Sequence, residues 1–200
     1  MTLGGRSAGG SPLVGVLALQ GGFEAHAKLL AKLGARVREV RTAADLENLD
    51  ALILPGGEST AITLAIEREH LADPLRDLIA TGTPTLGTCA GMILLDRSHL
   101  GVLDVQAERN AFGRQLHSFE TDLEIPGIDG GPVRAVFIRA PWIVAYGPGV
   151  EVLAEVDGHP VAIRQGNVLA LAFHPELSGE TRLHRLLLEE VAAARASKRQ

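Results

Sequence analysis

Residues 83–95 read TPTLGTCAGMILL, and this stretch decides the fold class. Residues 83–87 predict a strand, and residues 92–95 predict an apolar helical turn. Cys89 lies at the junction, between the glycines Gly87 and Gly91, which allow a sharp turn. A strand that runs directly into a helix is typical of a βα unit.

The same alternation runs through the whole first half of the chain. Strands are predicted over residues 13–19, 37–40 and 51–54, and helices over residues 23–33, 60–69 and 71–80. The strands at 13–19 and 51–54 are continuously apolar, as expected for strands covered on both faces. The sequence therefore predicts an α/β fold with a single-domain, doubly wound, mostly parallel sheet.

Beyond about residue 100 the pattern changes to short β-rich runs. These runs cover residues 102–105, 119–125, 133–138, 150–156, 161–164 and 168–173, and we expect them to be antiparallel additions that close the sheet. Helical spacing returns over residues 179–196. Residues 1–12 are rich in Gly and Ser and are predicted to be a flexible tail, which leaves one domain over residues 13–200.

Composition narrows the possible functions. The formal net charge is −5 and only seven of the 200 residues are aromatic (five Phe, one Trp and one Tyr), which argues against nucleic-acid binding. No apolar run approaches the roughly 20 residues that span a bilayer, and no signal peptide is evident, so a cytoplasmic protein without membrane contact is expected. Neither a paired-cysteine motif nor a phosphate-binding or HExxH motif occurs, so no metal or cofactor is predicted.

Cys89 is the single cysteine, and its setting predicts a nucleophile. At a strand-to-helix elbow its sulfur would lie at a helix N-terminus, which favours the thiolate. The N–H of Ala90 could then stabilise an oxyanion. The alternative is that Cys89 is a small buried apolar residue, the usual fate of a lone cysteine.

His174 is the best candidate for the base among the seven histidines. It ends the apolar run 168–173 and precedes Pro175 and Glu176, and catalytic groups favour such strand ends. In an extended segment Glu176 would project to the same side as His174 and could fix its tautomer, completing a Cys89, His174, Glu176 triad. The alternative is a turn followed by a solvated carboxylate.

Residues 55–60, PGGEST, form a glycine-rich loop after a predicted strand. Consecutive glycines allow close backbone approach and could offer N–H groups to an oxyanion or a substrate carboxylate. The alternative is a turn in which Ser59 or Thr60 caps the next helix.

Six motifs together resemble class I glutamine amidotransferases. They are LALQG at 17–21, PGGEST at 55–60, GTCAGM at 87–92, ERNAFGRQ at 108–115, FIRAP at 137–141 and FHPEL at 173–177. PGGEST, ERNAFGRQ and FIRAP are similar more narrowly to the glutaminase subunits of two-component pyridoxal 5'-phosphate synthases. The resemblance implies a flavodoxin-like three-layer fold and runs from about Val14 to the last helix, leaving out only the N-terminal tail.

The resemblance also implies the site and the partners. It assigns Cys89, His174 and Glu176 as the triad that hydrolyses L-glutamine through a glutamyl thioester. It places the substrate pocket at Gly57, Glu58, Ser59, Arg109, Ile138 and Arg139, and the oxyanion donors at Gly57 and Ala90. Ammonia would pass to a separate synthase subunit, in a hetero-oligomer, that makes pyridoxal 5'-phosphate from ribose 5-phosphate and glyceraldehyde 3-phosphate.

Two alternative functions stay open. Another ammonia-donating glutaminase, such as the one that serves imidazole glycerol phosphate synthesis, shares the elbow and triad, but PGGEST at 55–60 argues against it. A noncatalytic amidotransferase-like regulatory subunit would keep the fold without turnover, and the intact Cys89, His174 and Glu176 argue against that. The chain departs from its relatives in the extension before Leu13 and in Gly22-Phe23, near the surface expected to face the partner.

Overall fold

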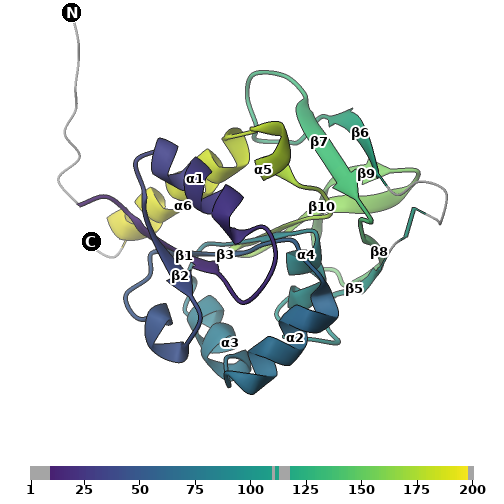
Figure 1. The fold of residues 1–200 in the computed structure, drawn as a ribbon. Helices are drawn as coiled ribbons and strands as arrows, with labels where there is room; N and C mark the ends of the chain where they lie inside the picture. The colour runs from purple at the N-terminus through teal and green to yellow at the C-terminus, as the bar shows by residue number, and fades with distance from the viewer. Residues whose placement is uncertain (1–9, 110, 113–117, 198–200) are drawn as a thin grey trace, which may run out of the picture.

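A computed structural model describes residues 10–109, 111–112 and 118–197. The centre of the fold is a seven-stranded sheet in the order β2-β1-β3-β4-β11-β10-β9 (Figure 1). These strands span Leu13–Leu17 (β1), Arg36–Val40 (β2), Ala51–Leu54 (β3), Thr85–Thr88 (β4), Glu151–Val156 (β9), His159–Gln165 (β10) and Val168–Leu171 (β11). The first five strands in this order run parallel, and β10 and β9 are antiparallel additions. The predicted doubly wound α/β fold is confirmed.

The continuously apolar strands lie in the middle of the sheet. Every residue of β1, β3, β4 and β11 is buried. The edge strand β2, RVREV, is by contrast mostly exposed or half-buried, and only Val40 in it is fully buried. Full burial on both faces explains why the central strands lack polar alternation.

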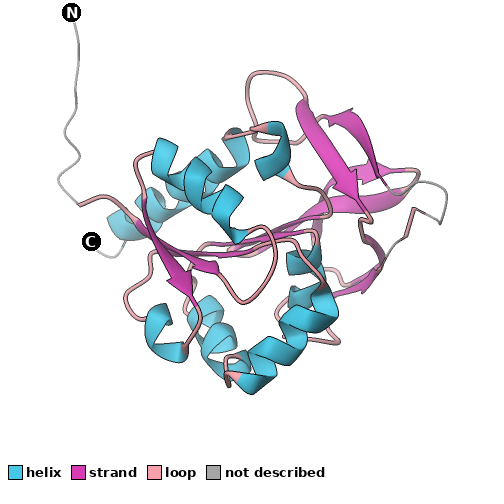
Figure 2. Cartoon of the chain, in the orientation of Figure 1, coloured by secondary structure: helices cyan, strands magenta, loops and turns pink. Residues whose placement is uncertain are grey.

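Helices cover both faces of the sheet (Figure 2). On one face lie α1 (Phe23–Lys32), α5 (Pro175–Ser178) and α6 (Arg182–Ser197); on the other lie the 3₁₀ turn η1 (Ala43–Leu46), α2 (Ser59–Arg68), α3 (Ala72–Ala80) and α4 (Ala90–Leu95). Together they enclose one continuous apolar core with the sheet in its middle. The result is a three-layer arrangement.

The β-rich second half differs in part from the prediction. Only β9 and β10 extend the main sheet antiparallel, and β11 joins it parallel to β4. The other runs form two separate two-stranded sheets, β5 (Val105–Glu108) with β8 (Trp142–Tyr146) and β6 (Ser118–Leu123) with β7 (Val133–Ile138). The expectation that all these runs close one sheet is therefore wrong.

Three element assignments also need correction. The run 102–105 is a turn region, and β5 starts only at Val105. The strand β8 and the short helix α5 were not predicted, because Trp142–Tyr146 follows a proline and Pro175–Ser178 is only one helical turn. Pairing with β5, rather than local pattern, creates β8.

The division into a tail at 1–12 and a domain at 13–200 stays a prediction, since residues 1–9 and 198–200 lie outside the described part of the chain. Within the described residues no helix combines the length and the apolar character that crossing a bilayer would require.

Candidate active site

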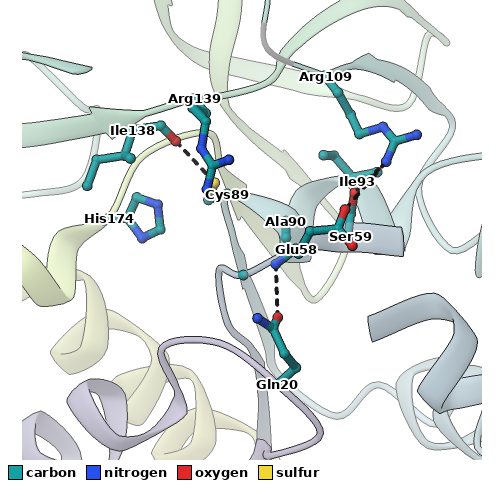
Figure 3. Close-up of a pocket in the computed structure, with 11 residues that line it drawn as sticks. Gln20, Glu58, Ser59, Cys89, Ala90, Ile93, Arg109, Ile138, Arg139 and His174 are labelled. Carbon is teal, nitrogen blue, oxygen red and sulfur yellow. Dashed lines mark hydrogen bonds and ion pairs between the residues drawn. The ribbon is translucent and has the colours of Figure 1, made fainter. Parts of the chain in front are cut away.

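The site lies where four parallel strands end. Because β1, β3, β4 and β11 are neighbours and run parallel, their carboxyl ends meet at one edge of the sheet. The segments that follow these strands contain Gln20, Gly57, Cys89 and His174, and all four residues line one pocket of about 330 Å³ (Figure 3).

Cys89 occupies the turn between β4 and α4. Its backbone has φ 49° and ψ −107°, a strained conformation for a residue other than glycine. Its N–H donates to the carbonyl of Leu171 at 2.8 Å, and its Sγ lies 3.9 Å from the carbonyl oxygen of Ile138. The predicted elbow is present, and Cys89 lines the pocket although it is 7% exposed.

The two glycines of the elbow are required by packing. A Cβ on Gly91 would overlap the carbonyl oxygen of Leu54 in β3, and a Cβ on Gly87 would overlap Leu95 of α4. Small residues at both positions therefore let α4 start immediately after the sheet and keep Cys89 at its N-terminus.

His174 and Glu176 form a tight pair. Nδ1 of His174 lies 2.7 Å from Oε1 of Glu176, and their side chains are 12% and 2% exposed. The contact was predicted, but the predicted reason is wrong, because the segment is not extended. His174 caps α5, Pro175 is its first residue and Glu176 lies in its first turn.

The pair is held in its charged form by its surroundings. Burial lowers the pKa of His174, but hydrogen bonds and charge interactions with Cys89 and Glu176 outweigh it and raise the pKa to about 10. Burial raises the pKa of Glu176, yet its hydrogen bond to His174 and the nearby His26 lower it overall. The arrangement favours an imidazolium at His174 that faces Cys89 on one side and the Glu176 carboxylate on the other.

The glycine-rich loop at 55–60 borders both catalytic side chains. A Cβ on Gly56 would overlap Cε1 of His174 and would lie 3.2 Å from Cβ of Cys89. Glu58 caps α2: its carboxylate accepts from the N–H groups of Thr60 at 3.1 Å and Ala61 at 2.6 Å, and these bonds lower its pKa. The expectation that Ser59 or Thr60 caps this helix is wrong, since Glu58 takes that role.

The loop also fixes the direction of one peptide group. The carbonyl of Gly56 accepts a hydrogen bond from the N–H of Gly22 at 2.9 Å. In a trans peptide the N–H points opposite to the C=O, so the N–H of Gly57 points away from Gly22. Ala90 is the first residue of α4, and its N–H is one of the donors that a helix start leaves unpaired.

The remaining predicted site residues line the same pocket. Nη1 of Arg109 donates to Oγ of Ser59 at 3.1 Å and to Oγ1 of Thr60 at 2.7 Å. Ile138 is 37% exposed at the end of β7, and the following Arg139 has a positive φ of 45°. Every predicted site residue therefore lines the pocket except Glu176, which lies behind His174.

Two pocket residues were not predicted. Ile93 lies in the first turns of α4, and Gln20 accepts from the N–H of Glu58 at 2.9 Å, which ties the loop after β1 to the glycine-rich loop (Figure 3). A Cβ on Gly57 would overlap Oε1 of Gln20. The position of Gln20 just beyond a buried parallel strand was the signal that could have identified it.

Solved structures share the fold of this chain. A crystal structure of a glutamine amidotransferase superposes with a TM-score of 0.84 at 48% identity, over 90% of this chain and 98% of that chain. The structure of PurLQS from Thermotoga maritima shares the fold at a TM-score of 0.73 and 19% identity, over 92% of this chain and 99% of that chain.

The sequence comparisons are more specific. Pyridoxal 5'-phosphate synthase subunits PdxT of Frankia alni and of Parafrankia sp. (strain EAN1pec) are 50% and 52% identical to this chain. The alignments cover 92% and 94% of this chain and 96% and 98% of the two relatives. Residues 16–193 match the model of the SNO glutamine amidotransferase family. The chain therefore belongs to the SNO glutamine amidotransferase family.

Proposed function

We propose that this chain is the glutaminase subunit of a pyridoxal 5'-phosphate synthase and hydrolyses L-glutamine to L-glutamate and ammonia. The observation that carries the proposal is the convergence of Cys89, at a strained elbow, with the paired His174 and Glu176 at one pocket. The proposal is also supported by membership of the SNO glutamine amidotransferase family and by relatives of nearly equal length that are named as synthase subunits.

The first half of the reaction forms a thioester. The Cys89 thiolate attacks the side-chain carbonyl carbon of glutamine, an S–C bond forms, and the carbonyl electron pair moves onto oxygen. The N–H groups of Gly57 and Ala90 hold this oxyanion, and each donor contributes about 3 kcal/mol. When the oxyanion collapses, the C–N bond breaks and the His174 imidazolium gives its proton to the departing ammonia.

The second half releases glutamate. Neutral His174 takes a proton from a water molecule, and the resulting hydroxide attacks the thioester carbon. The C–S bond then breaks, glutamate leaves, and the thiolate–imidazolium pair is restored. Glu176 keeps the proton of His174 on Nδ1, so that Nε2 exchanges protons with the reactants.

The substrate pocket offers charge for the amino-acid end of glutamine. Arg109 and Arg139 supply guanidinium groups for the α-carboxylate, and Glu58 and Ser59 line the pocket next to Arg109. The Ile138 backbone next to Cys89 positions the carboxamide. These substrate-binding roles are the ones that the resemblance to glutamine amidotransferases implies for the same residues.

The partner is a synthase subunit that uses the ammonia. The relatives are named as subunits of a pyridoxal 5'-phosphate synthase, so the sugar phosphates would bind the other subunit. A cytoplasmic location fits the single cysteine, which must stay reduced to react.

The test is glutamine hydrolysis by the chain mixed with the synthase subunit of a pyridoxal 5'-phosphate synthase. We expect glutamate release and glutamine-dependent formation of pyridoxal 5'-phosphate, and loss of both with Cys89→Ala or, largely, with His174→Asn. Glutamate release by Cys89→Ala at the wild-type rate would refute the nucleophile. Product formation only with a different ammonia-using synthase, such as imidazole glycerol phosphate synthase, would refute the partner.

A further inference from the structure

A buried polar chain lies directly behind the catalytic pair. Its members are His26 of α1 and His184 of α6, both 0% exposed, together with Thr88 and Glu176. Nδ1 of His26 lies 2.8 Å from Nε2 of His184, and Nε2 of His26 lies 3.1 Å from Oγ1 of Thr88 and 3.4 Å from Oε2 of Glu176. None of the catalytic steps above uses either histidine.

The inner oxygen of Glu176, Oε2, is the reason to assign a role to these buried polar side chains. Oε1 is taken by His174, but Oε2 is buried and has no hydrogen bond among the described residues. A buried carboxylate oxygen without a donor is costly. At 3.4 Å, Nε2 of His26 is the basic group that faces this oxygen, slightly beyond ordinary hydrogen-bond length.

The proton arrangement of the two histidines follows from their neighbours. If His26 carries its proton on Nε2, the N–H donates to Oγ1 of Thr88, with Oε2 of Glu176 3.4 Å from the same nitrogen, and Nδ1 accepts a hydrogen bond from His184. The reverse tautomer would direct a lone pair at the Glu176 carboxylate. It would also leave a buried N–H on Nδ1 of His184, which makes no hydrogen bond among the described residues.

Burial keeps both histidines neutral. Burial and the charge of His174 lower the pKa of His26, and these effects outweigh Glu176, which raises it. Burial and His26 lower the pKa of His184 to about 4, against the opposing effects of Glu176 and of the backbone and side chain of Glu180. The full charge of the carboxylate outweighs the Glu180 carbonyl dipole in choosing the tautomer.

We propose that His26 is a positioning residue for the proposed glutaminase reaction: its neutral imidazole, held in the Nε2–H form by His184, directs an N–H at the inner oxygen of Glu176 and fixes the carboxylate that orients His174. A neutral donor suits this role, because it anchors the carboxylate without cancelling the negative charge that stabilises the His174 imidazolium. His26 itself does not line the pocket and does not touch the substrate.

The test compares His26→Met, which removes the donor at similar size, with His26→Gln, whose amide N–H can replace Nε2–H. Glutamine hydrolysis is measured in the complex with the synthase subunit. We expect His26→Met to lower kcat about tenfold with little change in KM, and His26→Gln to recover most of the loss. His70→Asn, on the exposed surface, is the control for histidine loss and should match wild type.

A second measurement tests the role of His26 without depending on the proposed glutaminase function. Cys89 is the single cysteine, so alkylation by iodoacetamide in the isolated chain reports on one thiol. The pH profile of alkylation should move to higher pH in His26→Met, because a loosened Glu176 stabilises the imidazolium–thiolate pair less. His26→Gln should return the profile towards wild type, which a loss of packing alone would not do.

Histidine nitrogen NMR on the wild-type chain covers the case in which His26→Met does not fold. His26 should be neutral and protonated on Nε2 at pH 7. Three results would each overturn the inference. The first is protonation of His26 on Nδ1, and the second is wild-type kcat and wild-type alkylation in a folded His26→Met variant. The third is an equal defect in the Met and Gln variants. If the wild-type complex released no glutamate, the proposed function would fail, while alkylation and NMR would still decide the role of His26.

Discussion

His174 and Glu176 are joined by a 2.7 Å hydrogen bond across a single helical turn that begins with Pro175. The turn is short because Gly179 ends it in the left-handed conformation, with φ 70°. Proline at the first helical position fixes the backbone next to His174 without losing a hydrogen bond. The geometry of the pair is therefore built into the six consecutive residues 174–179 rather than into distant packing.

Replacing Glu176 with Gln should remove most of the activity. The amide keeps the size of the side chain but loses the charge that stabilises the imidazolium, and it can turn its N–H towards Nδ1 and impose the wrong tautomer. We expect kcat to fall roughly 10⁴-fold, as for the equivalent change in serine proteases. Because Glu176 helps to raise the pKa of His174, its loss should also move the alkaline limit of activity to lower pH.

A matched control is Glu151→Gln, on the exposed start of β9. It removes the same charge far from the pocket and should leave glutamate release unchanged over the whole pH range. A Glu176→Gln rate within threefold of wild type would contradict the role given to the carboxylate.

The parallel half of the fold was predictable because its central strands are buried on both faces and therefore rich in apolar residues. The predicted strand 51–54 matches β3 in full, and the predicted helices at 23–33 and 60–69 match α1 and α2 within about a residue at each end. The second half was less predictable. Whether β6 and β7 join the main sheet or pair with each other depends on contacts that local alternation does not encode.

The candidate active site also contains some residues that the sequence could predict and others that it could not. Cys89, His174 and the glycine-rich loop follow strands, so their meeting at one sheet edge could be inferred from strand order. His26 could not be ranked from sequence, because it occupies an ordinary helical position in α1. Its importance appears only once α5 and α6 bring Glu176 and His184 against it.

Replacing Gly56 with Ala should damage catalysis more than stability. A single methyl group there would overlap Cε1 of His174 and press on Cβ of Cys89 at 3.2 Å, and a displacement of about 1 Å in a reacting group costs roughly 10²-fold in rate. Steady-state kinetics should show the loss in kcat/KM with little change in Tm. Gly149→Ala, where a Cβ meets only Gln165 at 3.9 Å, should behave as wild type; equal kinetics for both variants would disprove the steric argument.

Replacing Arg109 with Met should weaken glutamine binding. Arg109 is held over the start of α2 by Ser59 and Thr60, where its charge can meet a carboxylate in the pocket. Loss of one charged hydrogen bond, about 1.5–3 kcal/mol, should raise KM at least tenfold while kcat stays within a few-fold. Arg68→Met at the other end of α2 is the control; an unchanged KM in Arg109→Met would exclude Arg109 from substrate binding.

Asp50 ties the C-terminal helix to the sheet, and this contact predicts a pH-dependent stability. Its carboxylate accepts from Arg195 of α6 at 2.7 and 3.0 Å and from the N–H of Leu13 in β1 at 2.7 Å. Burial raises the pKa of Asp50, but these bonds lower it overall. A folded-state pKa below the unfolded value means that the contribution is complete at neutral pH, above the unfolded pKa, and is lost as pH falls through the folded pKa.

Asp50→Asn should therefore lower the free energy of unfolding by about 1–2 kcal/mol at pH 7, since the pair is partly exposed and its charge interaction is screened. Urea unfolding at pH 7 and again at an acidic pH should show the difference between variant and wild type shrinking, because the wild-type carboxylate takes up a proton as the pH falls through its lowered pKa. Asp157→Asn, in the turn between β9 and β10, should change stability by less than about 0.5 kcal/mol at either pH. A difference for Asp50→Asn that stays constant between the two pH values would show that shape, and not charge, holds α6 to the sheet.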